Sequence, residues 1–417
     1  MKRRTKLFVL VLAVLYSASF AWASGSGEVK FGALVPLTGP LAEFGEGFRK
    51  AGDLAVQQFQ DAGFPIVIKY ADTETAEIAG TEAARVLVNI EQVSALIGAA
   101  ASGTTVAVAQ SVSIPNQIPQ ISNSSTAPLI SILPADEGQD FIFRTAPSDA
   151  LQGVVLGQLA IDTGYKRAAI LYVNNQYGQG LMEQFKTSFE FRGGTVVAAV
   201  PHDNRPAPTY VSELRQAMDD NPDVMLALGY PGQATVYLKE FFEAGYAEDT
   251  DILFCDGTRS VDMPEALGSQ NLAGYLGTVA GTVTGNSLTN FEADYEAVFG
   301  ELPPLPYMTS FYDAVVVAGL AAAAAQARGL PLTGVNIRDM LREVSNPPGE
   351  VVNAGVAGLT KAIELLNAGR SINYEGAAGA VDFNEYGDVV TPIDVWEYTS
   401  SSPYIRTVRT VSEIPAK

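Results

Sequence analysis

Short apolar runs alternate with longer amphipathic segments along most of this chain. The first apolar run, residues 29–36, reads as a strand, and residues 41–62 follow with apolar positions three and four apart, the spacing of one helix face. Further predicted strands are 66–70, 93–98, 119–122 and 141–145, and further predicted helices are 77–90 and 104–111. Strands that alternate with helices in this way indicate βαβ units and parallel sheets.

The same pattern starts again after residues 145–149. The predicted strands of this second series are 167–173, 195–200, 223–228 and 251–255, and its helices are 151–163, 179–191, 209–219 and 233–244. Several of these strands are apolar throughout, which is typical of sheets covered by helices on both faces. Two series of similar length predict an α/β fold with two doubly wound parallel-sheet lobes.

The remainder of the chain is less regular. Small residues at 277–285 predict a second crossing between the lobes, where they would accommodate hinge rotation. Helices are expected at 291–299, 308–328 and 356–367. Alternating residues over 381–398, around a turn at Glu385 to Asp388, predict a β-hairpin.

The charge balance excludes several classes of function. Lys and Arg number 26 against 46 Asp and Glu, a formal net charge of −20, so nucleic acids and anionic membranes would repel the chain. The sequence has one His, His202, and one Cys, Cys255. An intrachain disulfide framework and a zinc site built from several Cys and His are therefore excluded, and a Ser-His-Asp triad would have a single available base.

Residues 1–23 have the features of a secretory signal peptide: a basic start, an apolar run and small residues that end at Ala21-Trp22-Ala23. We predict cleavage before Ser24 and export to the periplasm. The alternative, a membrane anchor, would need a longer apolar run. The apolar, Ala-rich segment 314–325 is too short to span a membrane and is expected to be a packed helix.

Ligands of open parallel sheets bind beyond the carboxyl ends of the strands, next to helix N-termini. Two such strand ends in the first lobe carry hydroxyl groups: Ser102 and Thr104 after one strand, and Ser124 and Thr126 after the next. Together with free backbone N–H groups, these loops would bind one carboxylate. The alternatives are that Ser102 and Thr104 only cap a helix and that the second loop is a polar turn.

The second lobe contributes an acid and two aromatic rings at strand ends. Asp256 would face a cationic group, although an Asp before Gly is also common in solvated turns. Tyr177 and Tyr230 lie in Gly-containing loops and would cover an apolar side chain or donate an O–H; the alternative is that they are surface Tyr residues. Phe44 lies on the apolar stripe of the first helix, which is also the pattern of core packing.

Motifs of enzymes are absent. The chain has no G-x-x-x-x-G-K-[ST], no G-x-S-x-G and no H-E-x-x-H. We therefore expect a protein that is not an enzyme, with no catalytic residue, no cofactor and no metal. The alternative is a secreted hydrolase that uses Ser102 or Cys255 with His202 as base, although Cys255 ends an apolar strand and is predicted to be buried and inert.

The ordered strand-end loops resemble those of the extracytoplasmic solute-binding proteins of ATP-driven importers, type I fold, leucine/isoleucine/valine-binding group. The segments that carry the resemblance are FGALVPLTGPLAEFGEGFRKAGDLAVQQF, IGAAASGTT, PQISNSSTAP, FIFRTAPSDALQG, ILYVNNQYGQGL, LALGYPGQA, FCDG, SFYDAVVVAG and GAVDFNEYGD. The resemblance implies a two-lobed clamp with a three-segment hinge. The implied N-terminal lobe is 28–147 and 280–390, and the implied C-terminal lobe is 148–279 and 391–417.

The resemblance also implies roles for individual residues. Ser102 corresponds to a hydroxyl ligand of an amino acid's carboxylate, Ser124 would contribute its backbone, and Thr126 its hydroxyl and N–H. Asp256 would pair with the ammonium group. The remaining implied contacts are aromatic, with two clamping rings, a side-chain-pocket residue and a residue on the hinge side: Tyr177, Tyr230, Phe44 and Tyr312.

This sequence departs from the branched-chain prototypes of the family at three positions. It has Asp256 where they have Glu, Phe44 where they have Tyr, and Ala101 where they have a disulfide Cys. These departures concern the specificity for the ligand's side chain more than the recognition of an amino-acid headgroup.

The expected function is the capture of an aliphatic or branched-chain amino acid and its delivery to the membrane permease of an ABC importer. The expected protein is a periplasmic monomer that binds this small molecule and the permease but no nucleic acid. The alternatives are a ligand-sensing clamp for a membrane receptor, and a clamp that binds a small amide, an aromatic acid or another carboxylate.

Overall fold

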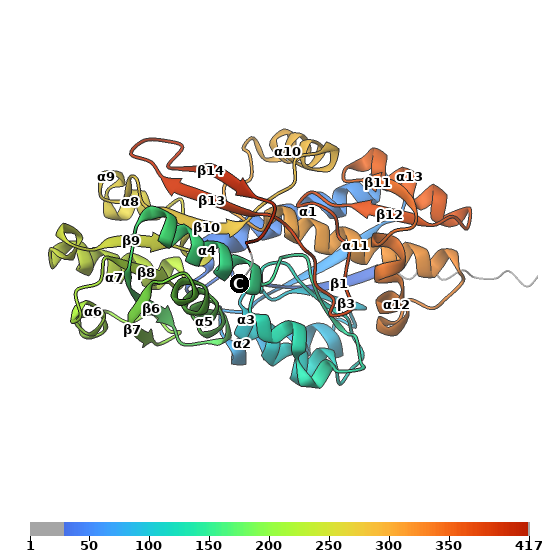
Figure 1. Cartoon of the computed structure of the whole chain (residues 1–417). Coiled ribbons are helices and arrows are strands. Elements are labelled where there is room, and N and C mark those ends of the chain that lie inside the picture. Colours follow the sequence, from blue (N-terminus) through green and yellow to red (C-terminus); the bar gives the residue numbers. More distant parts are fainter. Residues whose placement is uncertain (1–28, 416–417) are drawn as a thin grey trace, which may run out of the picture.

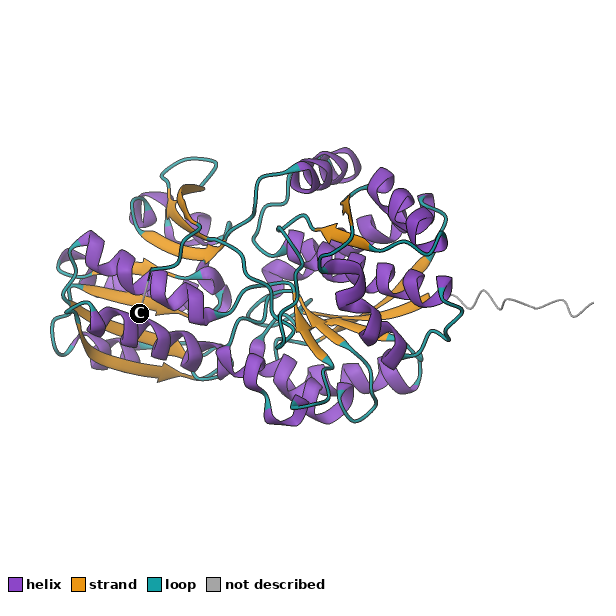
Figure 2. Ribbon diagram, turned by 45° about the vertical axis from the view of Figure 1, so that its right-hand side comes forward, coloured by secondary structure: helices purple, strands orange, loops and turns teal. Residues whose placement is uncertain are grey.

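The computed structural model describes residues 29–415, which form two lobes that lie side by side (Figure 1). Each lobe contains one large sheet with helices packed against it (Figure 2). The predicted α/β fold with two doubly wound parallel-sheet lobes is confirmed. The predicted signal peptide, residues 1–23, lies outside the described residues.

The sheet of the N-terminal lobe has five strands in the order β2-β1-β3-β4-β5, and each neighbouring pair is parallel. The strands are β1 (Val29–Val35), β2 (Ile66–Asp72), β3 (Ala95–Gly98), β4 (Gln120–Ser122) and β5 (Ile142–Arg144). The helices between them are α1 (Gly45–Asp61), α2 (Glu77–Asn89) and α3 (Ser102–Val108). The central strands β1 and β3 are almost entirely buried, as their apolar sequences predict.

The sheet of the C-terminal lobe has seven strands in the order β14-β13-β10-β9-β8-β6-β7. They are β6 (Arg167–Val173), β7 (Thr195–His202), β8 (Val224–Leu228), β9 (Asp251–Phe254), β10 (Leu276–Ala280), β13 (Ile393–Tyr398) and β14 (Ile405–Val411). The pairs β10–β13 and β13–β14 are antiparallel, and the other pairs are parallel. The helices are α4 (Asp149–Thr163), α5 (Gln176–Phe191), α6 (Val211–Met218), α7 (Pro231–Glu243), α8 (Met263–Leu267) and α9 (Ser269–Leu272).

Between β10 and β13 the chain returns to the N-terminal lobe. This return segment contains α10 (Asn286–Phe299), α11 (Met308–Ala327), α12 (Gly334–Ser345), β11 (Glu350–Asn353), α13 (Val356–Asn367) and β12 (Ile372–Glu375). Helix α11 is long and apolar enough to cross a membrane, but the apolar stretch is entirely buried inside the lobe, against α1, α12 and α13. It is the core helix of this lobe. The chain therefore crosses between the lobes after β5, after β10 and before β13.

The prediction of a β-hairpin over 381–398 is wrong. Strand β13 pairs with β10 and β14 instead, and the residues before it form a turn without a partner strand. The alternation of apolar and polar residues arises because Val381, Phe383 and Val389 are buried individually. The turn is held by Asp388, whose carboxylate accepts two hydrogen bonds from the buried Arg144 guanidinium, at 2.6 and 2.9 Å.

This ion pair provides a test of the crossing segment. Asp388→Ala would leave the fully buried Arg144 without its counter-ion, and we expect the free energy of unfolding to fall by about 3–5 kcal/mol in urea denaturation. Glu343→Ala removes the exposed ion pair with Arg328 and should cost less than about 1 kcal/mol. Equal, small losses for the two variants would show that the buried pair does not hold the crossing in place.

Candidate functional site

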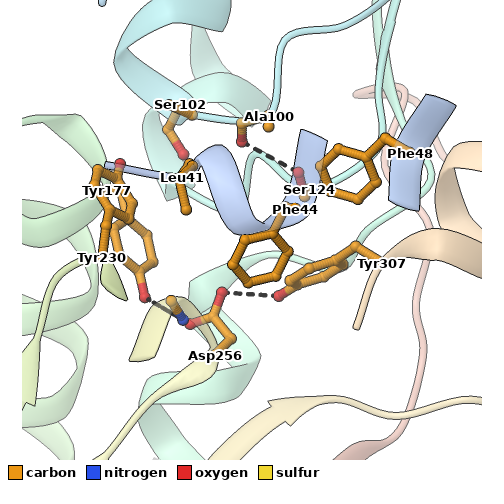
Figure 3. Close-up of a pocket in the computed structure, with 12 residues that line it drawn as sticks. Leu41, Phe44, Phe48, Ala100, Ser102, Ser124, Tyr177, Tyr230, Asp256 and Tyr307 are labelled. Carbon is orange, nitrogen blue, oxygen red and sulfur yellow. Dashed lines mark hydrogen bonds between the residues drawn. The ribbon is translucent and has the colours of Figure 1, made fainter. Parts of the chain in front are cut away.

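A cavity lies between the lobes, where strand ends of both sheets meet (Figure 3). Its walls come from strand-end loops and from segments close to helix N-termini in both lobes. The residues that line it are Leu41, Phe44, Phe48, Ala100, Ala101, Ser102, Ser124, Tyr177, Tyr230, Asp256, Gly257 and Tyr307.

The N-terminal lobe contributes the loops after β3 and β4 to the cavity. Hydrogen bonds of serine hydroxyls link these two loops. Ser122, the last residue of β4, donates to the Ala99 carbonyl at 2.7 Å, and Ser124, in the loop that follows, donates to the Ala100 carbonyl at 3.3 Å. The Ser102 hydroxyl, at the start of α3, accepts from the Ala127 N–H at 3.2 Å. The two loops converge because β3 and β4 are neighbours in the sheet. The first N–H groups of a helix have no partner within it, so α3 adds donors at the same edge.

The C-terminal lobe contributes Asp256, which begins a short 3₁₀ turn, η6 (Asp256–Thr258), directly after β9. Its Oδ1 accepts from the Tyr177 hydroxyl at 2.7 Å and from Gln152 Nε2 at 2.9 Å. Its Oδ2 accepts from the Tyr307 hydroxyl at 2.8 Å. All three donors are neutral, so nothing bonded to this buried carboxylate offsets its charge.

Tyr177 and Tyr230 form one aromatic wall. Their rings are stacked, with centroids 5.6 Å apart and planes 12° apart. Tyr177 is in the first turn of α5 and Tyr230 precedes α7, so both rings stand at the edge where the sheet faces the other lobe. Asn175 holds the Tyr230 hydroxyl with a hydrogen bond of 3.0 Å. These contacts hold the two rings against each other at the cavity.

A second carboxylate, that of Asp149, is close enough to Asp256 for the two like charges to repel each other. Asp149 is fully buried; its Oδ2 accepts from the Thr126 hydroxyl at 2.9 Å, and its Oδ1 has no partner among the described residues. Burial, together with the charge of Asp256, raises the pKa of Asp149 well above its usual range. Burial also raises the pKa of Asp256, while the hydrogen bonds it accepts oppose that rise. Two buried carboxyl groups, Asp256 at the cavity and Asp149 close to it, thus lie without a bonded cation among the described residues.

Six of the eight residues predicted from the sequence line the cavity: Phe44, Ser102, Ser124, Tyr177, Tyr230 and Asp256. Thr126 does not line it, because its hydroxyl is turned to Asp149. The expectation that Tyr312 approaches the ligand from the hinge side is corrected. Its hydroxyl donates to Gln58 and accepts from the Gly355 N–H inside the N-terminal lobe. That the six lining residues bind a ligand stays a prediction.

Tyr307 occupies the hinge-side position that was expected for Tyr312. The two residues are five apart on or next to α11, and five residues turn a helix by about 500°, which leaves them on different faces. Leu41 and Phe48 also line the cavity. The sequence pattern places both on the apolar face of the helix predicted over 41–62 and does not mark them as ligand contacts. The sequence feature that could have pointed to Tyr307 as a site residue is its position directly before a predicted helix, after the Pro-rich segment 303–306.

The arrangement does not support the hydrolase alternative. Burial and the nearby Asp256 raise the pKa of the Cys255 thiol to about 12, which keeps it protonated and unreactive at neutral pH. His202 packs against Tyr210 and Tyr237, and its Nδ1 lies 3.1 Å from the Asp203 carbonyl. No hydrogen bond joins His202 to Ser102 or Cys255 within residues 29–415.

The periplasmic binding protein family model matches residues 28–354, and the chain belongs to this family. The chain is 28% identical over 382 residues to the chemotactic signal transduction system substrate-binding protein BasB of Halobacterium salinarum, covering 89% of this chain and 87% of that protein. It is 26% identical over 285 residues to Leu/Ile/Val-binding protein homolog 3 of Brucella melitensis, covering 66% and 74%.

Solved structures share the fold at low sequence identity. A leucine-binding protein from Thermotoga maritima has a TM-score of 0.74 and 21% identity, covering 92% of this chain and 99% of that one. A solute-binding protein of an ABC transporter from R. palustris, in complex with 4-hydroxybenzoate, has a TM-score of 0.73 and 18% identity, covering 93% and 98%. The family and these neighbours are solute-binding proteins rather than enzymes, and the family is extracytoplasmic.

The buried acid pair predicts how stability depends on pH. In the unfolded chain Asp149 has an ordinary pKa of about 3.9, whereas the folded state raises it. The folded state then holds a proton that the unfolded state releases, so the free energy of unfolding falls as pH rises above about 4, until the raised pKa is passed. Asp149→Asn removes this penalty and should raise Tm at pH 7 more than at pH 4.

Thermal unfolding followed by circular dichroism, without added ligand, measures this difference. Asp219→Asn, at an exposed position that ends α6, is the control and should leave the pH dependence unchanged. A lower Tm for Asp149→Asn at pH 7 would contradict the raised pKa.

Proposed function

We propose that this protein captures an amino acid with a small aliphatic side chain between its lobes and delivers it to the membrane permease of an ABC importer. The observation that carries the proposal is the position of Asp256, in the C-terminal lobe, across one cavity from the hydroxyl-bearing loops of the N-terminal lobe. A zwitterion carries a negative and a positive end, so the two lobes could bind one end each.

The N-terminal lobe suits the carboxylate of the ligand. Ser102 and Ser124 line the cavity there, and the start of α3 adds N–H groups and the positive end of a helix dipole. No Lys or Arg lines the cavity, so hydroxyl and N–H donors would bind the anion.

The C-terminal lobe suits the ammonium group. Asp256 accepts only from neutral donors, and the nearby Asp149 has an oxygen without a partner. A cationic group would neutralise this buried charge, which a ligand with only a carboxylate would not do. This favours an amino acid over an aromatic acid such as the 4-hydroxybenzoate bound by the R. palustris neighbour.

The remaining wall suits an aliphatic side chain. Leu41, Phe44 and Phe48 are buried and line the cavity together. Each methylene group that a ligand buries there contributes about 0.8 kcal/mol. The relation to the Leu/Ile/Val-binding homologue of Brucella melitensis supports the same class of ligand.

Capture follows from the division of the site between two lobes. Each open lobe holds donors or acceptors for one end of the ligand, and only the closed form holds both ends. A ligand shifts the equilibrium toward closure by its higher affinity for the closed form. The permease would then recognise the closed, loaded protein.

Isothermal titration calorimetry tests the headgroup assignment. We expect L-leucine, L-isoleucine or L-valine to bind, and we expect 4-methylpentanoate, 3-methylbutylamine and 4-hydroxybenzoate to bind much more weakly or not at all. Asp256→Asn keeps the shape of the side chain and removes its charge, and should weaken amino-acid binding at least about thirtyfold.

Asp219→Asn, at an exposed position of the C-terminal lobe, is the charge-matched control and should bind like the parent. Tight binding of 4-hydroxybenzoate together with no amino-acid binding would overturn the proposed ligand class. Unchanged amino-acid affinity for Asp256→Asn would remove Asp256 from the ammonium site.

A second candidate function is the presentation of the ligand to a membrane chemoreceptor. The similarity to BasB over 89% of this chain favours it, and the same clamp would serve both uses. Crosslinking of the leucine-loaded protein in membranes of the source organism, followed by mass spectrometry, separates the two. We expect permease subunits; recovery of a chemoreceptor alone would favour the second candidate.

A further inference from the structure

The side chain next to Phe44 crosses from one lobe to the other. Glu43 is in the 3₁₀ turn η1 (Ala42–Phe44) of the N-terminal lobe. Its Oε2 accepts from the Ser260 hydroxyl at 2.6 Å, and its Oε1 accepts from the N–H groups of Val261 at 2.8 Å and Asp262 at 3.4 Å. All three donors are in the C-terminal lobe, in the segment that follows η6.

The C-terminal lobe builds this receptor segment, residues 260–262, by itself. Ser260 donates its N–H to the Tyr398 hydroxyl at 3.1 Å, and its own hydroxyl accepts from the Met263 N–H at 3.1 Å. Tyr398 is fully buried in β13 and also donates to the Thr258 carbonyl at 2.9 Å. These bonds do not involve the N-terminal lobe, so the donors are in position before Glu43 arrives.

The Glu43 carboxylate has no cation bonded to it in the described part of the chain. Contact with the other lobe withdraws it from water, and this burial together with the neighbouring Asp262 raises its pKa, while its three hydrogen bonds oppose that rise. When the lobes separate, water would solvate both the carboxylate and its donors. The contact therefore forms only when the lobes are closed. When they open, water replaces the three protein donors of the Glu43 carboxylate.

Two further hydrogen bonds between the lobes do not involve a carboxylate, and they are longer. Gly232 N–H donates to the Pro40 carbonyl at 3.2 Å, and Asn204 Nδ2 donates to the Thr75 carbonyl at 3.4 Å. Both join neutral groups. Hydrogen bonds to a charged group are shorter and about twice as strong, so the Glu43 contact is stronger than either of these two. Next to the cavity, two other bonds to carboxylates also join the lobes: Tyr307 to Asp256 at 2.8 Å and Thr126 to Asp149 at 2.9 Å.

We propose that Glu43 is a closure latch, a positioning residue that sets the balance between open and closed lobes and the residence time of the ligand without touching it. Glu43 is not part of the cavity wall, whereas its neighbour Phe44 is. One short turn thus presents an apolar ring to the ligand and a carboxylate to the opposite lobe. The effect on residence time rests on the proposed function; the effect on the lobes themselves does not.

The first experiment needs no ligand. Dyes on Gln60→Cys and Lys239→Cys, at exposed positions of α1 and α7, report the distance between the lobes by single-molecule FRET, since the native Cys255 is buried. We expect Glu43→Ala to shift the population toward open lobes. Glu46→Ala is the matched control and should leave the population unchanged, because Glu46 is exposed and forms an ion pair with Arg49 of its own helix.

The second experiment measures the dissociation rate of L-leucine by stopped flow. We expect Glu43→Ala to raise this rate about tenfold to a hundredfold, with a small change in the association rate. Ser260→Ala removes the donor of the shortest hydrogen bond to Glu43 and should also raise the dissociation rate. The double variant should dissociate little faster than Glu43→Ala alone, because both substitutions remove the same contact. Thermal unfolding of each variant confirms that it folds.

The outcomes distinguish this proposal from the function it rests on. An open shift in Glu43→Ala combined with no leucine binding by the parent overturns the ligand class and leaves the latch standing. Unchanged FRET populations and an unchanged dissociation rate in folded Glu43→Ala overturn the latch. Additive effects of Glu43→Ala and Ser260→Ala would show that the two side chains act separately.

Discussion

A carboxylate buried without a cation organises the centre of this protein. Removing a charge from water costs several kcal/mol unless hydrogen bonds or an opposite charge compensate. Asp256 obtains the hydrogen bonds from Tyr177 and Gln152 of its own lobe and from Tyr307 at the hinge. The opposite charge is left to the ligand in the function we propose. Side chains from three separate segments thus direct their donors to this one acid.

The fold alone leaves the ligand open. Proteins with TM-scores of 0.74 and 0.73 to this chain include a leucine-binding protein and one solved with 4-hydroxybenzoate. A shared backbone therefore supports ligands with and without an ammonium group. The distinction depends on a few side chains at strand ends, and here the excess of buried acid in the C-terminal half of the site favours a cationic group.

In the roles that we propose, closure and ligand binding depend on the same short segment after β1. Phe44 faces the cavity while Glu43 faces the opposite lobe, so consecutive side chains of one turn serve the two tasks. Pro40, in the same segment, accepts from Gly232. A substitution at position 44 would thus change the wall of the cavity, whereas one at the neighbouring position 43 would change the contact between the lobes. The proximity allows each property to change while the backbone stays the same.

The sequence by itself determined the order of strands and helices and the loops that meet the ligand cavity. Those features are local: apolar periodicity distinguishes strand from helix, and a parallel sheet brings successive strand ends to one edge. Ser102, Ser124 and Asp256 could be placed near the cavity for this reason. The tertiary structure alone decided that Tyr307 rather than Tyr312 faces the cavity, since the phase of a buried helix depends on what packs around it. The same holds for Asp149, Glu43 and the absent hairpin, because their partners are distant in sequence and only the crossings between lobes bring them together.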